Sequence, residues 1–217
     1  MREPAKSKAA RTIEVINRLA KAYPEAQCEL NFANPLELLI ATILSARCTD
    51  RQVNVVTARL FKKYRSPDDY AQSDPSDLEL DLKSLGLYRN KAKSIQSCCR
   101  RLIELHGGQV PRTAAELMQL GGVGRKTANV VLGNAFNIND GIAVDTHVAR
   151  LAGRLGLSAH KLPEKIEADL KKLVPQEKWT LFSHWLIWHG RRRCYARHPD
   201  CLHCEVNDLC PSAFRFD

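Results

Sequence analysis

Residues 117–128 read LMQLGGVGRKTA, which is a short helical stretch, a run of glycines and the start of a second helix. Glycine allows the backbone to turn tightly and to approach another molecule closely. The N–H groups at the start of the second helix form a ready site for a phosphate oxygen. A tight turn between two helices would use the same glycines without binding anything. The basic pair Arg125-Lys126 favours the phosphate-binding interpretation.

Helix signals dominate the rest of the chain. Asn34-Pro35-Leu36-Glu37 has the N-cap, N1 proline and N3 glutamate of a helix start, and Thr49 with Gln52 forms a second capping box. No stretch alternates with period two, as a half-buried strand would. We therefore expect an all-α protein, with helices near residues 13–23, 35–46, 50–64, 75–86, 89–106, 114–121, 125–136, 146–155, 163–173 and 176–189.

The charge of the chain points to a polyanionic partner. Lysine and arginine number 33 against 24 for aspartate and glutamate, which gives a formal charge of +9. No acidic residue lies between Lys178 and Pro199, and that interval contains Arg191, Arg192, Arg193 and Arg197. A solvated basic face is the ordinary interpretation, but a rigid loop could hold these arginines in register with phosphates. Nucleic acid is favoured over a membrane, because no basic amphipathic helix with a bulky apolar face is visible.

Four cysteines close the chain with the spacing C-x6-C-x2-C-x5-C: Cys194, Cys201, Cys204 and Cys210. Four thiols in one short loop indicate a metal site rather than a disulfide framework. Structural zinc sites more often have two Cys-x2-Cys knuckles, so an iron–sulfur cluster is favoured over zinc and over a metal-free thiol cluster. His203 is either an alternative ligand or a surface residue. The remaining cysteines are interpreted as small buried hydrophobic residues: Cys28, Cys48, Cys98 and Cys99. For Cys48, an exposed position is the alternative.

No targeting segment is visible in the sequence. Charges begin at Arg2 without an apolar signal region, and the longest apolar stretch, residues 36–46, is too short to span a bilayer. Because four cysteines cluster as candidate ligands, we expect a reducing compartment and a cytoplasmic, nucleoid-associated protein.

Five segments, in this order, resemble the endonuclease III family of DNA glycosylases, members of the helix–hairpin–helix superfamily. They are Leu44-Ser45-Ala46 with Thr49-Asp50, Gly86-Leu87-Tyr88, Gly122 to Val131, Ala143 to His147, and the four-cysteine loop. Each segment alone is a weak signal, whereas the ordered set is specific. The match extends from about Asn34 to Cys210, most of the chain.

The resemblance implies two helical domains that flank a DNA-binding cleft. A six-helix domain, residues 28–139, carries the helix–hairpin–helix. The second domain joins residues 1–27 to residues 140–217 and holds a [4Fe–4S] cluster in the loop 194–210. The resemblance also implies a monomer that excises oxidised or ring-saturated pyrimidines from double-stranded DNA and then cleaves the strand at the abasic site by β-elimination.

The resemblance assigns the chemistry to Lys126 and Asp145. An amine that attacks C1′ leaves an imine, which acidifies the 2′ proton and permits elimination of the 3′ phosphate. The positive end of a helix dipole at Lys126 favours the neutral amine. Asp145-Thr146-His147 also reads locally as an N-cap. The two interpretations of Asp145 agree, because a capped carboxylate stays ionised and can stabilise positive charge on the sugar.

The resemblance also assigns residues that enter or contact the duplex. Leu87 matches an apolar wedge, although locally it reads as a core leucine. At the position of Arg47 the family commonly has a glutamine, and at that of Gly121 it usually has a proline. Both residues therefore depart from the family pattern. The expected DNA contacts are Ser45, Arg47, Leu87, Gly122, Val123, Gly124, Arg125, His147, Arg191, Arg193 and Arg197.

Two rival functions remain in view. A monofunctional mismatch glycosylase of the same superfamily keeps the aspartate but lacks the lysine, so Lys126 argues against it. We also expect no extra domain of the adenine-mismatch type, because the sequence stops at Asp217. A non-catalytic DNA-structure-binding protein would leave the joint presence of Lys126 and Asp145 unexplained.

Overall fold

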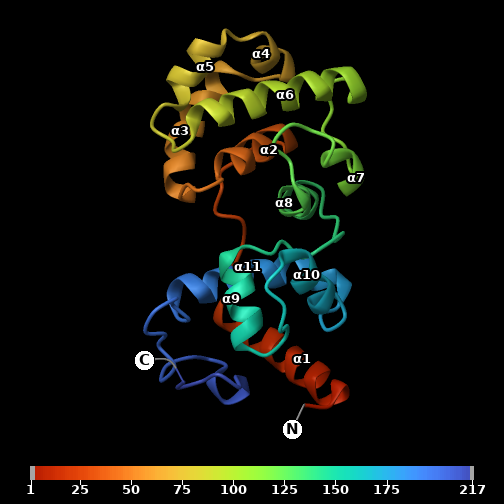
Figure 1. Cartoon of the computed structure of the whole chain (residues 1–217), viewed down its shortest axis with the longest axis vertical. Coiled ribbons are helices and arrows are strands. Elements are labelled where there is room, and N and C mark those ends of the chain that lie inside the picture. The colour runs from red at the N-terminus through yellow and green to blue at the C-terminus, as the bar shows by residue number, and fades with distance from the viewer. Residues whose placement is uncertain (1–2, 216–217) are drawn as a thin grey trace. The chain divides into compact units, whose positions relative to one another are not determined.

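The computed structural model describes residues 3–215, which contain helices and no strand (Figure 1). The all-α expectation is therefore confirmed. The helices are α1 (Ala5–Ala22), α2 (Pro35–Leu44), α3 (Asp50–Lys63), α4 (Pro67–Gln72), α5 (Pro75–Leu82), α6 (Tyr88–His106), α7 (Ala114–Leu117), α8 (Arg125–Ala135), α9 (Thr146–Arg154), α10 (Pro163–Lys171) and α11 (Trp179–Arg192), with the 3₁₀ turns η1 (Gln176–Lys178) and η2 (Asn207–Leu209). None of the helices described is long and apolar enough to cross a membrane.

The chain forms two compact units, each with its own hydrophobic core. Unit 1 consists of Met1–Gln27 and Asn139–Asp217, and unit 2 of Cys28–Ile138. Unit 1 thus contains α1 and α9 to α11, whereas unit 2 contains α2 to α8. The core residues of each unit come from that unit alone.

The core of unit 2 is built around α2. Every residue of this helix from Leu38 to Leu44 is buried, because α3, α6 and α8 all pack against it. Helices α4 and α5 cover α6. Burial of each such leucine or isoleucine contributes about 1.5–3 kcal/mol to folding, so this apolar helix is the main stabilising element of the unit.

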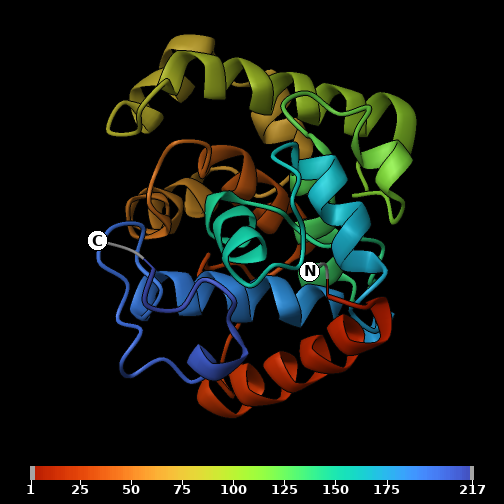
Figure 2. The ribbon, with the colours of Figure 1, turned by 60° about the horizontal axis from the view of Figure 1, so that its bottom comes forward.

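In unit 1, α11 has the corresponding role. Phe182 and Leu186 are completely buried, and both α1 and α9 pack against this helix. Figure 2 shows α1 running beside α11. The apolar stripe of α1, which includes Ile16 and Leu19, faces inward. The first α-helix of the chain therefore packs against the last one.

The capping signals of the sequence are confirmed, whereas several helix ends differ from expectation, among them that of α7, which ends at Leu117 rather than near residue 121. Asn34 Oδ1 accepts a hydrogen bond from Glu37 N at 3.0 Å, and Thr49 forms its capping box with Gln52. The helix expected to reach residue 46 ends at Leu44, because the chain turns through a left-handed residue at Arg47. The helix expected to reach residue 86 ends at Leu82.

Helix α4 was not expected from the sequence. Its six residues are too few for apolar periodicity to stand out, and Tyr70 is its only buried residue. Its start does carry a signal, since Ser66, Pro67 and Asp69 form a capping box with proline at the first turn.

The glycine hairpin rests directly on α6. Gly122 has φ 75°, and a Cβ there would lie 2.8 Å from the Cβ of Ser94. A Cβ on Gly121 would lie 2.7 Å from the Cβ of Ser97. Only residues without a side chain allow this close approach. Packing against α6 therefore holds Gly121 in place, although this residue departs from the family proline.

We expect Gly122→Ala to lower the free energy of unfolding by about 2–4 kcal/mol, because it combines a left-handed backbone with overpacking against Ser94. Gly124→Ala is the matched control. Gly124 has φ −101° and nothing within 4 Å of its Cβ position, so it should lose less than about 1 kcal/mol. Urea denaturation of the two variants measures the difference, and equal losses would show that the hairpin does not depend on Gly122.

Candidate functional site

In unit 2, the hairpin presents the start of α8 to solvent. Gly124 occupies the N-cap position and, as a glycine, has no side chain with which to cap the helix. Backbone N–H groups at the start of an α-helix are a general binding site for anions. Lys126, in the first turn of α8, is exposed. A flexible amine thus lies beside a backbone that is suited to a phosphate.

Arg47 and Leu87, both exposed residues of unit 2, have left-handed backbones. Arg47 has φ 56° in the turn after α2, and Leu87 has φ 60° at the N-cap of α6. A non-glycine residue pays about 1–2 kcal/mol for this conformation, and such strain is common at binding sites. Leu87 is 52% exposed, so the local interpretation of a core leucine is wrong. Ser45, at the end of α2, uses its hydroxyl to donate to the Thr42 carbonyl at 2.8 Å.

In unit 1, Asp145 caps α9. Its Oδ1 accepts hydrogen bonds from the N–H groups of His147 and Val148, each at 2.8 Å. The side chain is half-buried, directly after the buried segment 141–144. Both bonds are made by Oδ1, so Oδ2 takes no part in capping the helix. One carboxylate oxygen therefore orients the group, and the other can interact with positive charge on a ligand.

Helix α9 also carries two arginines that bind the loop after α11. Arg150 Nη2 donates to the carbonyls of Gly190 and Cys194, at 2.9 and 3.0 Å. Arg154 donates to the carbonyls of Tyr195 and Ala196, at 2.6 and 2.9 Å. Sequence reasoning missed both arginines. Their spacing of four residues places them on one face of a helix, which the sequence does show. The spacing does not indicate which segment that face contacts.

His147 lies within this arginine network, 3.1 Å from Arg150 Nη2 through its Nδ1. Burial lowers the pKa of His147 below its usual value; Asp145 opposes the shift, and Arg150 and Arg191 add to it. The ring is therefore neutral at neutral pH and can donate one hydrogen bond without carrying a charge.

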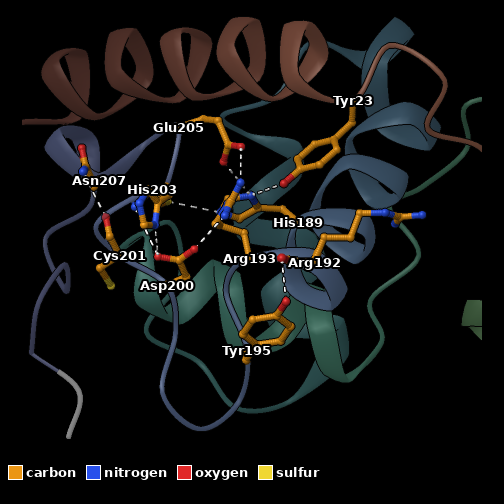
Figure 3. Close-up of polar contacts among 11 residues, drawn as sticks. Tyr23, His189, Arg192, Arg193, Tyr195, Asp200, Cys201, His203, Glu205 and Asn207 are labelled. Carbon is orange, nitrogen blue, oxygen red and sulfur yellow. Dashed lines mark hydrogen bonds and ion pairs between the residues drawn. The ribbon is translucent and has the colours of Figure 1, made fainter.

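The expected phosphate-binding arginines differ in their surroundings. Arg193 forms ion pairs with Asp200 at 2.7 Å and Glu205 at 3.6 Å, so its guanidinium is engaged within the loop. Arg192 lies over the Trp188 ring, 3.8 Å from the centroid. Arg191 is half-buried, and Arg197 is exposed. Figure 3 shows Asp200 joined to both Arg193 and His203.

The four loop cysteines line one cavity in unit 1. Cys194, Cys201, Cys204 and Cys210 surround about 360 Å³ of non-protein space, part of it open to solvent. Apolar side chains, including Leu151 and Leu155, complete the wall. His203, a possible ligand from sequence, is exposed and bonds to Asp200 at 2.8 Å, and it does not line the cavity.

Two thiols of this cavity, those of Cys204 and Cys210, disfavour ionisation on their own. Burial raises the pKa of Cys204 to about 12, and Glu205 and Cys194 add to the shift. Burial also raises the pKa of Cys210, with Cys194 and Cys201 adding to it. Four converging thiolates are stable only with a compensating cation, and a bound metal deprotonates its thiol ligands. The donor set therefore fits a metal centre held by four cysteines.

A buried histidine contacts one of these thiols. His189 is 1% exposed, with Nε2 3.4 Å from Cys204 Sγ and Nδ1 2.9 Å from the Tyr23 hydroxyl (Figure 3). Burial lowers the pKa of His189 to about 4. The neutral ring can accept from Tyr23 and donate to the thiol. Ligand atoms of His189, Cys204 and Glu205 also lie within 4.8 Å of one another.

Comparison with known proteins gives consistent matches. Residues 40–176 match the model of the HhH-GPD superfamily of base excision DNA repair proteins. The chain is 50% identical to endonuclease III of Synechocystis sp., covering 95% of this chain and 94% of that one. It is 44% identical to endonuclease III of Escherichia coli K12, covering 93% and 95%. A solved endonuclease III, trapped as a covalent intermediate with DNA, superposes with a TM-score of 0.91 at 47% identity, covering 95% and 97%.

We expect Cys201→Ser to lose its bound metal, because a hydroxyl is a poor substitute for a thiolate ligand. Cys28→Ser is the matched control, since Cys28 is also half-buried but does not line the cavity. Elemental analysis of the purified variants measures metal per chain. Equal metal content in both would contradict a four-cysteine centre.

Proposed function

The chain belongs to the endonuclease III family of bifunctional base-excision DNA glycosylases and lyases, and on that basis we propose that Lys126 and Asp145 excise damaged pyrimidines from duplex DNA. The observation that carries the proposal is the exposed Lys126 amine in the first turn of a helix whose N-cap is a glycine of the hairpin. The proposed substrate is double-stranded DNA that contains an oxidised or ring-saturated pyrimidine or an abasic site. We propose that a monomer acts on chromosomal DNA in the cytoplasm.

The proposed DNA contacts of unit 2 begin at the hairpin. Backbone N–H groups around Gly122 and Gly124 would hold one phosphate, and Arg125 would add a charge-assisted contact. These contacts recognise the backbone rather than the base, so they bring damaged and undamaged DNA to the enzyme alike. Selection of the lesion requires residues that enter the duplex.

We assign that entry to Leu87 and Arg47. Leu87 is exposed and held outward by its left-handed backbone, as a wedge between stacked bases requires. Arg47 is also exposed and left-handed, and its guanidinium offers only donors. An arginine at this position would favour guanine, whose major-groove edge carries two acceptors, as the orphaned base. Ser45 precedes this turn and is assigned a supporting contact.

Lys126 is the proposed nucleophile. Its neutral amine would attack C1′ of the flipped nucleotide, and the electron pair of the glycosidic bond would leave with the base. Loss of the ring oxygen bond then gives an imine between Nζ and C1′. The imine acidifies the 2′ proton, whose removal expels the 3′ phosphate. Exposure of Lys126 in the first turn of α8 supports this role, because the amine is accessible to a flipped nucleotide.

Asp145 is the proposed electrostatic partner of this reaction. Two backbone N–H groups fix its Oδ1, which leaves Oδ2 to stabilise positive charge developing on the sugar. His147, from the same helix turn, is assigned a phosphate contact. Arg191 and Arg197 are assigned further phosphate contacts, and Arg193 a weaker one, because its guanidinium already binds Asp200.

We propose that the four-cysteine cavity holds a [4Fe–4S] cluster, with Cys194, Cys201, Cys204 and Cys210 as its ligands. Four half-buried thiols around one space, in a loop that Arg150 and Arg154 hold to α9, support this assignment. When bound, the cluster supplies the cross-link that keeps the arginine-rich loop in one conformation. The metal analysis of Cys201→Ser and Cys28→Ser also tests the identity of the metal. About four irons per chain would support the cluster, and stoichiometric zinc would contradict it.

Lys126→Gln should abolish the covalent adduct that borohydride traps during turnover, because glutamine has no amine to form the imine. The variant should still bind DNA, since the hairpin backbone is unchanged. Lys93→Gln, which removes an exposed lysine from α6, is the control and should trap normally. Gel analysis of the adduct with an abasic-site oligonucleotide measures both. Trapping by Lys126→Gln would assign the attack to another amine.

Asp145→Asn should lower the rate of base excision by about 100-fold or more while leaving stability within about 1 kcal/mol, because asparagine keeps a capping oxygen but not the charge. Asp74→Asn is the control, since Asp74 caps α5 through Ser76 N at 2.8 Å and has no assigned role in the reaction. Single-turnover excision of thymine glycol and thermal denaturation give the two readouts. Normal excision by Asp145→Asn would reduce this residue to a cap.

A further inference from the structure

In unit 2, the buried Lys91 is paired with the half-buried Cys48. Lys91 Nζ donates to Cys48 Sγ at 2.9 Å, and Lys91 is only 4% exposed. Lysine is almost never buried so completely unless its charge has a partner. Among residues 3–215, the Cys48 thiol is the only hydrogen-bond or ion-pair partner of this amine. The contact is therefore an integral part of the unit rather than a chance surface approach.

The pair connects the two left-handed turns. Cys48 directly follows Arg47, and its N–H donates to the Ser45 carbonyl at 3.1 Å. Lys91 lies one helical turn after Leu87, and its N–H donates to the Leu87 carbonyl at 3.1 Å. The amine–thiol contact therefore holds the turn that carries Arg47 against the helix start that carries Leu87.

The thiols of Cys98 and Cys99, also in unit 2, lie in a different environment. Cys98 and Cys99 are fully buried, and burial raises the pKa of Cys98 to about 12. Cys48, by contrast, is half-buried, so a small oxidant can reach it from solvent. It also has an amine nitrogen already at hydrogen-bond distance from its sulfur. Cys48 thus combines access for an oxidant with a nucleophile placed beside the sulfur.

We propose that Cys48 and Lys91 are a peroxide-responsive modification site at which oxidation joins the two side chains through a sulfur–nitrogen bond. Hydrogen peroxide transfers one oxygen to the thiol, which becomes a sulfenic acid, and the other peroxide oxygen leaves as water. The Lys91 nitrogen then bonds to the sulfur, the sulfenic hydroxyl leaves as water, and one ammonium proton passes to solvent. The sulfur undergoes a two-electron oxidation, and peroxide is reduced. A thiol reductant reverses the link.

The link would pull the two turns together, because a covalent bond is much shorter than the 2.9 Å contact. The site goes beyond the proposed function, but its effect on excision rests on the roles assigned there to Arg47 and Leu87. Displacement of such groups by about 1 Å can lower a rate by about 100-fold. We expect the linked protein to excise damaged bases at least about tenfold more slowly than the reduced protein, with recovery after treatment with a thiol.

Peptide mass spectrometry of the metal-loaded protein tests the link directly. After dilute hydrogen peroxide and proteolysis, the peptides containing Cys48 and Lys91 should appear joined, with a mass about 2 Da below their sum. Cys48→Ser and Lys91→Met should each abolish the joined peptide, and Lys91→Arg provides a second variant that keeps the buried charge. Cys28→Ser should retain the link, because Cys28 is a half-buried thiol outside this pair.

Cys48 that carries one or two added oxygens without any joined peptide would overturn the proposal, as would equal linkage of Cys48 to other lysines. Excision by Cys48→Ser should be insensitive to the same peroxide treatment. Metal content, measured in parallel, separates this effect from damage to the four-cysteine loop. A link that forms without slowing excision would establish the site and count against the roles proposed for Arg47 and Leu87, so the two failures are distinguishable.

Discussion

The candidate site depends on one physical constraint. The first backbone N–H groups of an α-helix have no hydrogen-bond partner within the helix. An all-α chain has few other places where backbone donors remain available to a ligand. Lys126 lies in the first turn of α8, and Asp145 caps α9. Leu87 is the N-cap of α6, and Arg47 lies two residues before the N-cap of α3. The assigned chemistry therefore gathers where secondary structure leaves polar groups unsatisfied.

The two helix starts that carry the assigned catalytic groups resolve this constraint in opposite ways. Asp145 fills its own helix start with a carboxylate oxygen, which orients the group but uses up two N–H donors. Gly124 has no side chain to fill the start of α8, and a helix start of this kind suits a phosphate. One start therefore orients an anion of the protein, and the other suits an anion of the substrate.

The four-cysteine loop depends on a different kind of contact. Its residues contribute little apolar surface, since Val206 is the loop residue that is fully buried. Arginines from α9 bind its carbonyls, and Arg193 pairs with Asp200 and Glu205 inside it. Polar contacts and metal–thiolate bonds must therefore replace the hydrophobic core that short loops cannot form. This explains why part of a basic run that looked suited to phosphates is engaged within the protein.

The sequence by itself determined the helical class, most helix starts, the glycine turn and the cysteine spacing, because capping, periodicity and turn chemistry act within a few residues of the chain. It also supported the family through ordered motifs. Only the tertiary structure decided that Leu87 is exposed, that Arg193 is engaged within its loop, and that Lys91 is buried against Cys48. Each of these outcomes depends on which segments of the folded chain pack together, and no local pattern carries that information. Lys91 and Cys48, for example, are 43 residues apart in the sequence.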